Sequence, residues 1–184
     1  MSCELETIRL QLRLSQIKDT PILHRLWTND QIRYFLFDNR IISPDEAQSF
    51  VEDSVINFEK YGYGLWLIFK RNIDYLVGFA GFLNSEEGIP SLIYGVDPDY
   101  WGYGYATEAT SAVLSYALEK LAFPKVRADV DEPNIASVRV LEKLGMKQTG
   151  REVVNEHPLL YFEKLRFPEV QRSCSEEIAK QQLR

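Results

Sequence analysis

A glycine-containing turn lies between an apolar run, Ser91 to Val96, and the helical pattern of residues 103–121. Gly102 and Gly104 flank Tyr103 in this turn. Glycine lets the backbone turn tightly, and the first N–H groups of a helix have no hydrogen-bond partner inside it. These donors, together with the positive end of the helix dipole, favour an anion such as a phosphate at the Gly102–Gly104 turn.

The two best-known glycine-rich phosphate motifs do not match this turn. A dinucleotide-binding fingerprint requires a third glycine at position 107, where the sequence has Thr107, and no Gly-Lys-Ser/Thr sequence is present. A second Gly-x-Gly, Gly62 to Gly64, precedes an expected strand and is interpreted as a loop. The turn at residues 102–107 is therefore predicted to bind phosphate without either of these two motifs.

A second segment with potential chemistry is a short helix expected over residues 135–144. Asn134 is a good N-cap, and Gly145 followed by an apolar residue is typical of a helix end. Ser137 lies in the first turn, where its hydroxyl can bind the backbone or take part in a reaction. Asn134 can cap the helix, contact a ligand, or do both.

These segments resemble the GNAT superfamily of N-acetyltransferases, and in particular its RimJ/RimL-type ribosomal-protein acetyltransferases. Residues 97–109 (Asp-Pro-Asp-Tyr-Trp-Gly-Tyr-Gly-Tyr-Ala-Thr-Glu-Ala) resemble the family's acetyl-CoA signature. Residues 131–146 resemble its Asn-x-x-Ser/Ala helix, which ends in Glu-Lys-x-Gly-Phe, and residues 7–13 resemble its first strand. The matches occur in the expected order across residues 7–166.

The resemblance implies an α+β GNAT fold: a mixed, mostly antiparallel sheet of about seven strands, splayed between the fourth and fifth, with about four helices. Apolar and alternating runs predict strands at 8–14, 65–69, 75–83, 91–96, 125–130, 147–156 and 159–166. Helices are expected at 21–28, 43–60, 103–121 and 135–144. We expect one domain over residues 1–167, followed by a polar tail over residues 168–184.

The resemblance also implies a site for acetyl-CoA between the fourth and fifth strands. The implied cofactor-binding residues are Tyr94, Gly95, Val96, Gly102, Tyr103, Gly104, Tyr105, Ala106, Thr107 and Asn134. The turn would bind the pyrophosphate, and the strand would bind the pantetheine arm and donate a backbone N–H to the oxyanion. Gly95 suits a bulge, a close backbone approach or plain packing. Trp101 replaces the family's usual Gln or Arg.

Ser137 is the implied catalytic residue, as the hydrogen-bond donor to the departing thiolate. Leu141 occupies the position at which many family members have a tyrosine for this task. The family's strand glutamate, a general base, corresponds to Ser91, so no dedicated base is evident. An N-terminal α-amine, with a pKa of about 7.8, is partly neutral at pH 7 and has less need of a base.

Other polar residues near these motifs have two interpretations each. An acid in the first turn of a helix, such as Glu108, is usually structural but could act as a base. Glu156 and His157 are further candidates for the base in the last hairpin. Arg139 and Lys143 could contact the 3′-phosphate of the cofactor or belong to a solvated helix face.

The composition excludes several other classes of protein. The chain has 184 residues and a formal net charge of −6, which does not favour nucleic-acid binding. Cys3 and Cys174 are expected to be free thiols, no metal-ligand spacing is present, and no signal peptide or membrane span is visible. We therefore expect a cytoplasmic protein, monomeric or homodimeric, with no metal and no nucleic-acid or membrane partner.

The expected function is transfer of the acetyl group of acetyl-CoA to a primary amine, with a protein N-terminus as the favoured acceptor. A small amine, such as a polyamine or an antibiotic, is the alternative acceptor. A non-catalytic CoA-binding or interaction module is the alternative class. The aromatic residues Trp27, Tyr34, Phe35 and Phe37 either pack the first helices on the sheet or line the acceptor cleft.

Overall fold

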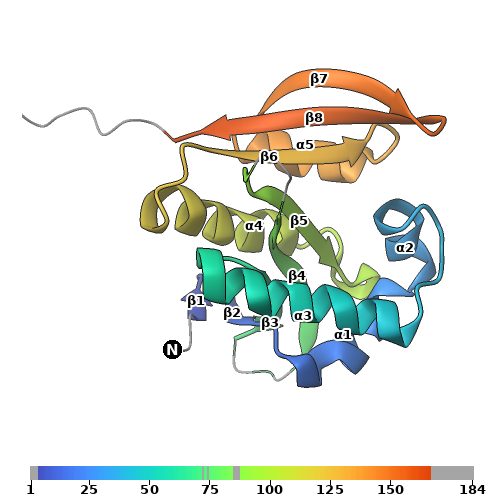
Figure 1. The fold of residues 1–184 in the computed structure, drawn as a ribbon, viewed down its shortest axis with the longest axis vertical. Helices are drawn as coiled ribbons and strands as arrows, with labels where there is room; N and C mark the ends of the chain where they lie inside the picture. Colours follow the sequence, from blue (N-terminus) through green and yellow to red (C-terminus); the bar gives the residue numbers. More distant parts are fainter. Residues whose placement is uncertain (1–3, 72, 74, 85–87, 167–184) are drawn as a thin grey trace, which may run out of the picture.

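The computed structural model describes residues 4–71, 73, 75–84 and 88–166. In this part of the chain, eight strands form one mixed sheet with five α-helices around it (Figure 1). The strands are β1 (Glu4–Glu6), β2 (Leu10–Leu14), β3 (Leu65–Lys70), β4 (Leu76–Leu83), β5 (Ser91–Val96), β6 (Lys125–Asp131), β7 (Lys147–Val154) and β8 (His157–Leu165). The helices are α1 (Thr20–Trp27), α2 (Asp30–Leu36), α3 (Pro44–Tyr61), α4 (Tyr105–Ser115) and α5 (Ile135–Lys143). The predicted tail, Cys3 and Cys174 lie outside the described residues.

The sheet opens between β5 and β6. The strand order is β1-β2-β3-β4-β5-β6-β8-β7, and every neighbouring pair is antiparallel except β5 and β6. These two parallel strands are in register at one pair, Ser91 and Arg127, and then diverge (Figure 1). The expected splay between the fourth and fifth predicted strands is confirmed, and it lies between β5 and β6 because β1 precedes the predicted set.

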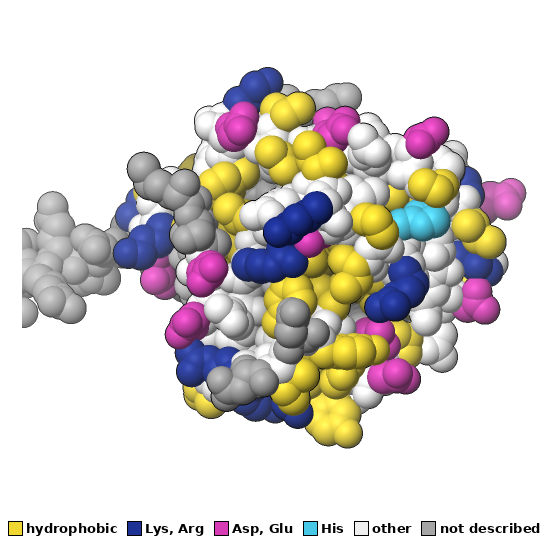
Figure 2. Space-filling view, turned by 90° about the horizontal axis from the view of Figure 1, so that it is seen from below, with side chains coloured by type: hydrophobic (Ala, Val, Ile, Leu, Met, Phe, Trp, Pro, Cys, Tyr) yellow, Lys and Arg dark blue, Asp and Glu magenta, His cyan; other side chains and the backbone are white. Residues whose placement is uncertain are grey.

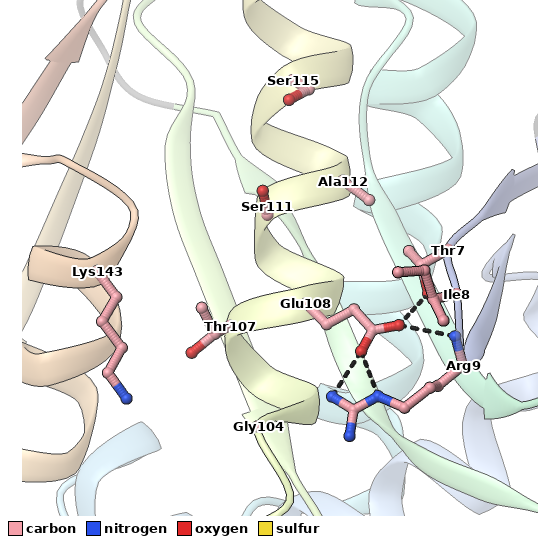
Figure 3. A pocket seen from close by; sticks show the side chains of 10 residues that line it. All are labelled: Thr7, Ile8, Arg9, Gly104, Thr107, Glu108, Ser111, Ala112, Ser115 and Lys143. Carbon is pink, nitrogen blue, oxygen red and sulfur yellow. Dashed lines mark hydrogen bonds and ion pairs between the residues drawn. The ribbon is translucent and has the colours of Figure 1, made fainter.

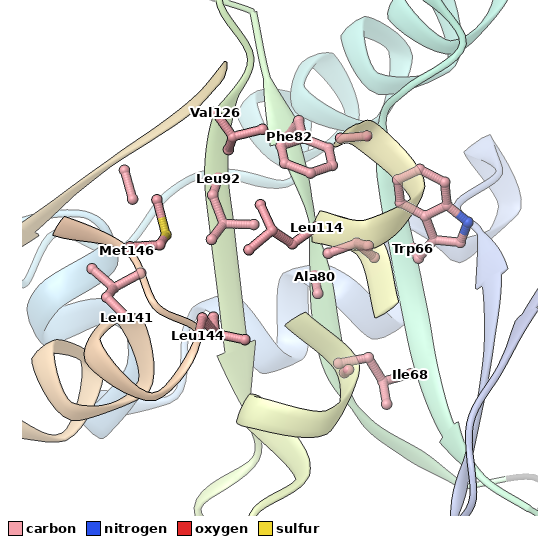
Figure 4. Close-up of a cluster of buried hydrophobic side chains, with 14 of the residues drawn as sticks. Trp66, Ile68, Ala80, Phe82, Leu92, Leu114, Val126, Leu141, Leu144 and Met146 are labelled. Atoms are coloured by element: carbon pink, nitrogen blue, oxygen red, sulfur yellow. The ribbon is translucent and has the colours of Figure 1, made fainter. Parts of the chain in front are cut away.

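Both faces of the central strands are covered, and this explains their nearly continuous apolar sequences. Helices α1 and α3 cover one face, where Trp27 and Val51 pack against Leu67 and Phe79. Helix α4 and part of α5 cover the other face, in a core that Figure 4 shows in part. Residues drawn there include Trp66, Ile68, Ala80, Phe82, Leu92, Leu114, Val126, Leu141, Leu144 and Met146.

Local capping sets the ends of two predicted helices. Ser43 and Glu46 form a reciprocal capping box at the start of α3, and Gly62, at φ +80°, ends that helix. Asn134 caps α5, because its side chain accepts a hydrogen bond from the backbone N–H of Ser137 at 3.2 Å. Both helices begin where the sequence predicts.

Three elements differ from the prediction. Strand β2 begins at Leu10 instead of Ile8, which lies in the turn after β1 and is 90% exposed. Helix α2 is additional to the four expected. Helix α4 ends at Ser115 and continues as a wider π-helical segment, Tyr116–Lys120, where the Tyr116 hydroxyl donates a hydrogen bond to the carbonyl of Gly62 at 2.9 Å.

The aromatic cluster near the first helices packs mainly against the sheet. The Trp27 ring makes edge contacts with Phe37 and Phe79, at centroid distances of 6.3 and 5.8 Å. Tyr34 is 57% exposed and contacts Phe35. The packing interpretation therefore holds for Trp27 and Phe37.

The face of the molecule seen in Figure 2 carries mixed side chains. Basic groups are scattered there among hydrophobic and acidic ones. No helix in the described part of the chain has the length and apolar character needed to cross a membrane.

Candidate active site

The Gly102–Gly104 turn presents free backbone donors at one end of the opening. Gly102 and Gly104 have φ values of +82° and +79°, which favour glycine. Gly104 is the N-cap of α4, no side chain caps this helix, and its first helical bond runs from Glu108 N–H to Gly104 at 3.1 Å. The N–H groups of Tyr105, Ala106 and Thr107 therefore have no partner within the helix. This arrangement suits the pyrophosphate of acetyl-CoA.

Strand β5 presents part of its backbone to the opening. The N–H of Asp97 donates to the carbonyl of Val77 on β4 at 2.8 Å, which fixes the alternation along β5. Tyr94 and Val96 consequently direct their backbone groups toward β6, while Gly95 pairs with Phe79 on β4. The indole N–H of Trp101 donates to the Val96 carbonyl at 2.7 Å, so the free donor of this residue is its N–H.

Gly95 is a packing glycine in this structure. The β4–β5 register is regular from Val96 to Ser91, with no bulge. A Cβ at Gly95 would lie 2.6 Å from Cε1 of Phe79, which is closer than real Cβ contacts. Of the interpretations open from the sequence, the geometry supports close packing against the Phe79 ring.

Tyr94 links β5 to α5 across the opening. Its hydroxyl donates a hydrogen bond to the backbone carbonyl of Ser137 at 3.0 Å. Burial raises the pKa of Tyr94 to about 12, although the hydrogen bond to Ser137 acts in the opposite direction. The phenol is therefore a neutral donor at physiological pH.

Ser137 is half-buried on the first turn of α5, beside Tyr94. Its N–H binds Asn134 and its carbonyl binds Tyr94, while its hydroxyl has no hydrogen bond to any residue that the structure describes. Leu141, one turn later, is fully buried in the core. The hydroxyl of Ser137 is thus available to a ligand, whereas position 141 is part of the packing.

An open groove of about 690 Å³ runs along the exposed side of α4 (Figure 3). It is lined by Thr7, Ile8, Arg9, Gly104, Thr107, Glu108, Ser111, Ala112, Ser115 and Lys143. Lys143 therefore shares a groove with Gly104 and Thr107 of the predicted cofactor site. Arg139 is exposed and does not line the groove.

The Glu108 carboxylate is hydrogen-bonded to two residues of the turn between β1 and β2. Its carboxylate accepts hydrogen bonds from the Thr7 hydroxyl at 2.6 Å, the Arg9 amide at 2.8 Å and the Arg9 guanidinium at 2.6 Å. Burial would raise the pKa of Glu108, but these hydrogen bonds and the charge of Arg9 outweigh burial and hold it below its ordinary value. The structural interpretation of Glu108 is the one that the geometry supports.

One face of β6 carries two carboxylates, the exposed Asp129 and the half-buried Asp131, that are not among the sequence-predicted site residues. Asp129 accepts a hydrogen bond from the Ser91 hydroxyl at 3.4 Å, where β5 and β6 separate. Burial raises the pKa of Asp131, and the nearby charges of Asp38 and Asp129 raise it further, while His157 acts in the opposite direction. The alternation of charged residues with Val126, Ala128 and Val130 was the signal that could have placed both carboxylates on one face.

The remaining predicted polar residues lie at the β7–β8 turn, where His157 is close enough to Asp131 to act on its pKa. Glu156 and His157 are exposed at the β7–β8 turn. Among the described residues, no group of three side chains suitable for a metal ion occurs.

A sheet that opens between two parallel strands, beside a glycine turn and a helix N-terminus, is the arrangement that the resemblance to the GNAT acetyltransferases predicts. The family comparison agrees: residues 9–147 match the acetyltransferase (GNAT) domain model. The chain belongs to the GNAT family of N-acetyltransferases. Members of this family use acetyl-CoA as the acetyl donor.

Relatives in sequence include a protein named as an N-acetyltransferase. The chain is 30% identical over 149 residues to the uncharacterized N-acetyltransferase YoaA of Bacillus subtilis, covering 79% of this chain and 84% of YoaA. It is 31% identical over 150 residues to the uncharacterized protein YkkB of the same organism, covering 78% and 84% of the two chains.

Solved structures show the same fold at lower identity. A GNAT-family acetyltransferase of Bordetella pertussis has a TM-score of 0.77 at 21% identity, with 88% of this chain and 98% of that chain covered. RimL, a ribosomal alpha-N-protein acetyltransferase, has a TM-score of 0.75 at 18% identity, with 90% and 95% covered. Another RimL structure contains coenzyme A.

Proposed function

We propose that the protein transfers the acetyl group of acetyl-CoA to the α-amine of a protein N-terminus, as a RimJ/RimL-type enzyme. The observation that carries the proposal is the opening between β5 and β6. It has the free donors of the Gly102–Gly104 turn at one end and the free hydroxyl of Ser137 at its side. The resemblance in residues 97–109 and the fold of RimL support the RimJ/RimL type.

In the proposed reaction the amine nitrogen attacks the thioester carbonyl directly. A C–N bond forms, the C–S bond breaks, and the amine proton passes to water. The N–H of Val96 or Tyr94 faces the opening and would stabilise the oxyanion. The Ser137 hydroxyl would donate a hydrogen bond to the thiolate of CoA as it leaves. Asn134 would hold the first turn of α5, and the first-turn N–H groups of α4 would bind the pyrophosphate.

The test begins with cofactor binding. Millimolar acetyl-CoA should raise the melting temperature by mass action, and Gly104→Val should abolish the rise by straining the turn and crowding the phosphates. Gly88→Val is the matched control. Gly88 also has a positive φ, +69°, but a Cβ there would meet no atom within 4 Å. Absence of any stabilisation of the natural protein by acetyl-CoA would refute the proposal.

The second step identifies the acceptor. Release of CoA is measured with peptides carrying a free α-amine, with N-terminally blocked lysine peptides, and with polyamines. We expect the first group to react fastest. Tight CoA binding with no acetylation of any amine would instead favour a non-catalytic module.

A small cationic amine is the second candidate acceptor. The carboxylates of Asp129 and Asp131, with Asp38 nearby, give the opening a negative environment that would attract such a molecule. Faster reaction of polyamines than of N-terminal peptides would establish this alternative.

A further inference from the structure

We propose that Arg9, in the turn between β1 and β2, is a positioning residue for the acetyl donor. It holds the Gly102–Gly104 turn in the conformation that binds the pyrophosphate. The proposal rests on the acetyl-CoA site described above. The proposal assigns a role to Arg9, which lies 94 positions away in sequence from Tyr103, the residue whose carbonyl it binds.

Arg9 contacts both the Gly102–Gly104 turn and α4, the helix that follows it. Its guanidinium donates a hydrogen bond to the backbone carbonyl of Tyr103 at 2.8 Å and an ion-paired hydrogen bond to Glu108 at 2.6 Å. It also lies over the ring of Tyr105, 4.8 Å from the centroid. One planar cation thus contacts the middle of the turn and both the first and the fourth residue of α4.

Glu108 and Thr7 fix the position of the guanidinium. Glu108 accepts hydrogen bonds from Thr7 and from both the side chain and the backbone N–H of Arg9 (Figure 3). These contacts join the N-terminal turn to the first turn of α4. Because Glu108 neutralises Arg9, the pair restrains the turn without adding a free cation to it.

The turn has a physical need for such an external contact. Its two glycines have positive φ values and retain more conformational freedom than other residues. Trp101 restrains the start of the turn through the carbonyl of Val96, and Arg9 restrains the Tyr103–Gly104 peptide, near the end of the turn, through the carbonyl of Tyr103. With both ends held, the N–H groups of the first turn of α4 are preorganised for an anion, so less entropy is lost on binding.

The test compares two acetyl donors. Acetyl-CoA contains the pyrophosphate, whereas S-acetylpantetheine lacks it. Arg9→Ala should raise the KM for acetyl-CoA on the order of tenfold, as expected for the loss of a hydrogen bond to a charged group. It should change kcat at saturating donor little, and leave kcat/KM with S-acetylpantetheine unchanged. Arg9→Lys should give an intermediate KM, because an ammonium group lacks the planar fork that reaches both partners.

Arg71→Ala is the matched control. Arg71 is hydrogen-bonded to Arg9 through its backbone, but its side chain pairs with Glu6, away from the turn, at 2.5 Å. It should leave both donors unaffected. If Arg9→Ala fails to fold, Glu108→Gln tests the same network, since it weakens the anchor of the guanidinium while leaving Arg9 present.

The outcomes separate the two proposals. Equal loss with both donors in Arg9→Ala, or an unchanged KM for acetyl-CoA, would overturn the role of Arg9. Failure of the natural protein to bind acetyl-CoA would instead overturn the proposed function.

Discussion

At the scale of single residues, the contrast between positions 137 and 141 of α5 shapes the chemistry. Leu141 is fully buried, whereas the Ser137 hydroxyl, beside Tyr94, has no hydrogen bond to any residue that the structure describes. If this hydroxyl binds sulfur only as negative charge develops, Ser137→Ala should lower kcat about 10- to 1000-fold. The affinity for acetyl-CoA should change much less. Steady-state kinetics and calorimetric binding measure the two effects, and unchanged turnover would remove Ser137 from the mechanism.

Tyr94 gives a prediction about stability at alkaline pH. Its folded-state pKa of about 12 lies above the ordinary value of 10, so the folded state retains the phenolic proton more strongly than the unfolded state. The contribution of Tyr94 to the free energy of unfolding is fully present below pH 10 and is lost as the pH rises toward 12. The loss amounts to about 3 kcal/mol, because each unit of pKa difference is worth about 1.4 kcal/mol. Urea unfolding of the natural protein and of Tyr94→Phe at pH 9 and pH 11.5 isolates the contribution. An equal decline in both proteins would contradict it.

At the scale of elements, the N-terminus of α5 has a cap whose role can be separated from cofactor binding. Asn134→Ala should destabilise the protein by about 1 kcal/mol, because it leaves the N–H of Ser137 without its acceptor. Asn134→Asp can still accept that hydrogen bond and should restore stability. If Asn134 also contacts the cofactor through its amide nitrogen, the aspartate variant will have normal stability but a raised KM for acetyl-CoA. A normal KM would limit Asn134 to capping.

Local signals were sufficient to predict those elements whose boundaries depend on neighbouring residues. Ser43 with Glu46, and Asn134 with Gly145, mark helix ends within a few positions, and α3 and α5 begin where expected. The two glycines likewise predicted the tight turn before α4, in which the structure gives both of them positive φ values.

Contacts between distant segments could not be predicted in the same way. Arg9 meets Glu108 across 99 positions, from the turn of the β1–β2 hairpin, which the Thr7 N–H closes by donating to the Leu10 carbonyl at 2.9 Å. The Tyr94 phenol meets Ser137 across 43 positions. Asp129 was also missed, because its position beside Ser91 depends on the pairing of β5 with β6. These arrangements require the assembled sheet.

At the scale of the whole molecule, the free energy needed to deprotonate the amine bears on the choice of acceptor. A lysine side chain, with a pKa of about 10.4, is about 3.5 kcal/mol harder to deprotonate at pH 7 than an α-amine with a pKa of about 7.8. Without a dedicated base, kcat/KM should rise with pH through the acceptor's own pKa, and N-terminally blocked lysine peptides should react poorly. Rate profiles from pH 5 to 10 with both peptides provide the measurement. Efficient lysine acetylation with an enzyme-derived pKa near 6–7 would point to a base such as Asp131, the carboxyl group whose pKa is raised by burial.

The single register pair between β5 and β6 also has a consequence for the order of folding. Strands β1 to β5 are neighbours in the same order as in the chain, and β6, β7 and β8 all come from the residues after Pro124. Each half of the sheet is therefore built from pairings within its own stretch of the chain. As the chain is synthesised, the first five strands can pair before the last three exist. The junction of β5 with β6 needs a strand from each stretch, so during synthesis the opening where the thioester would react can form only once β6 exists.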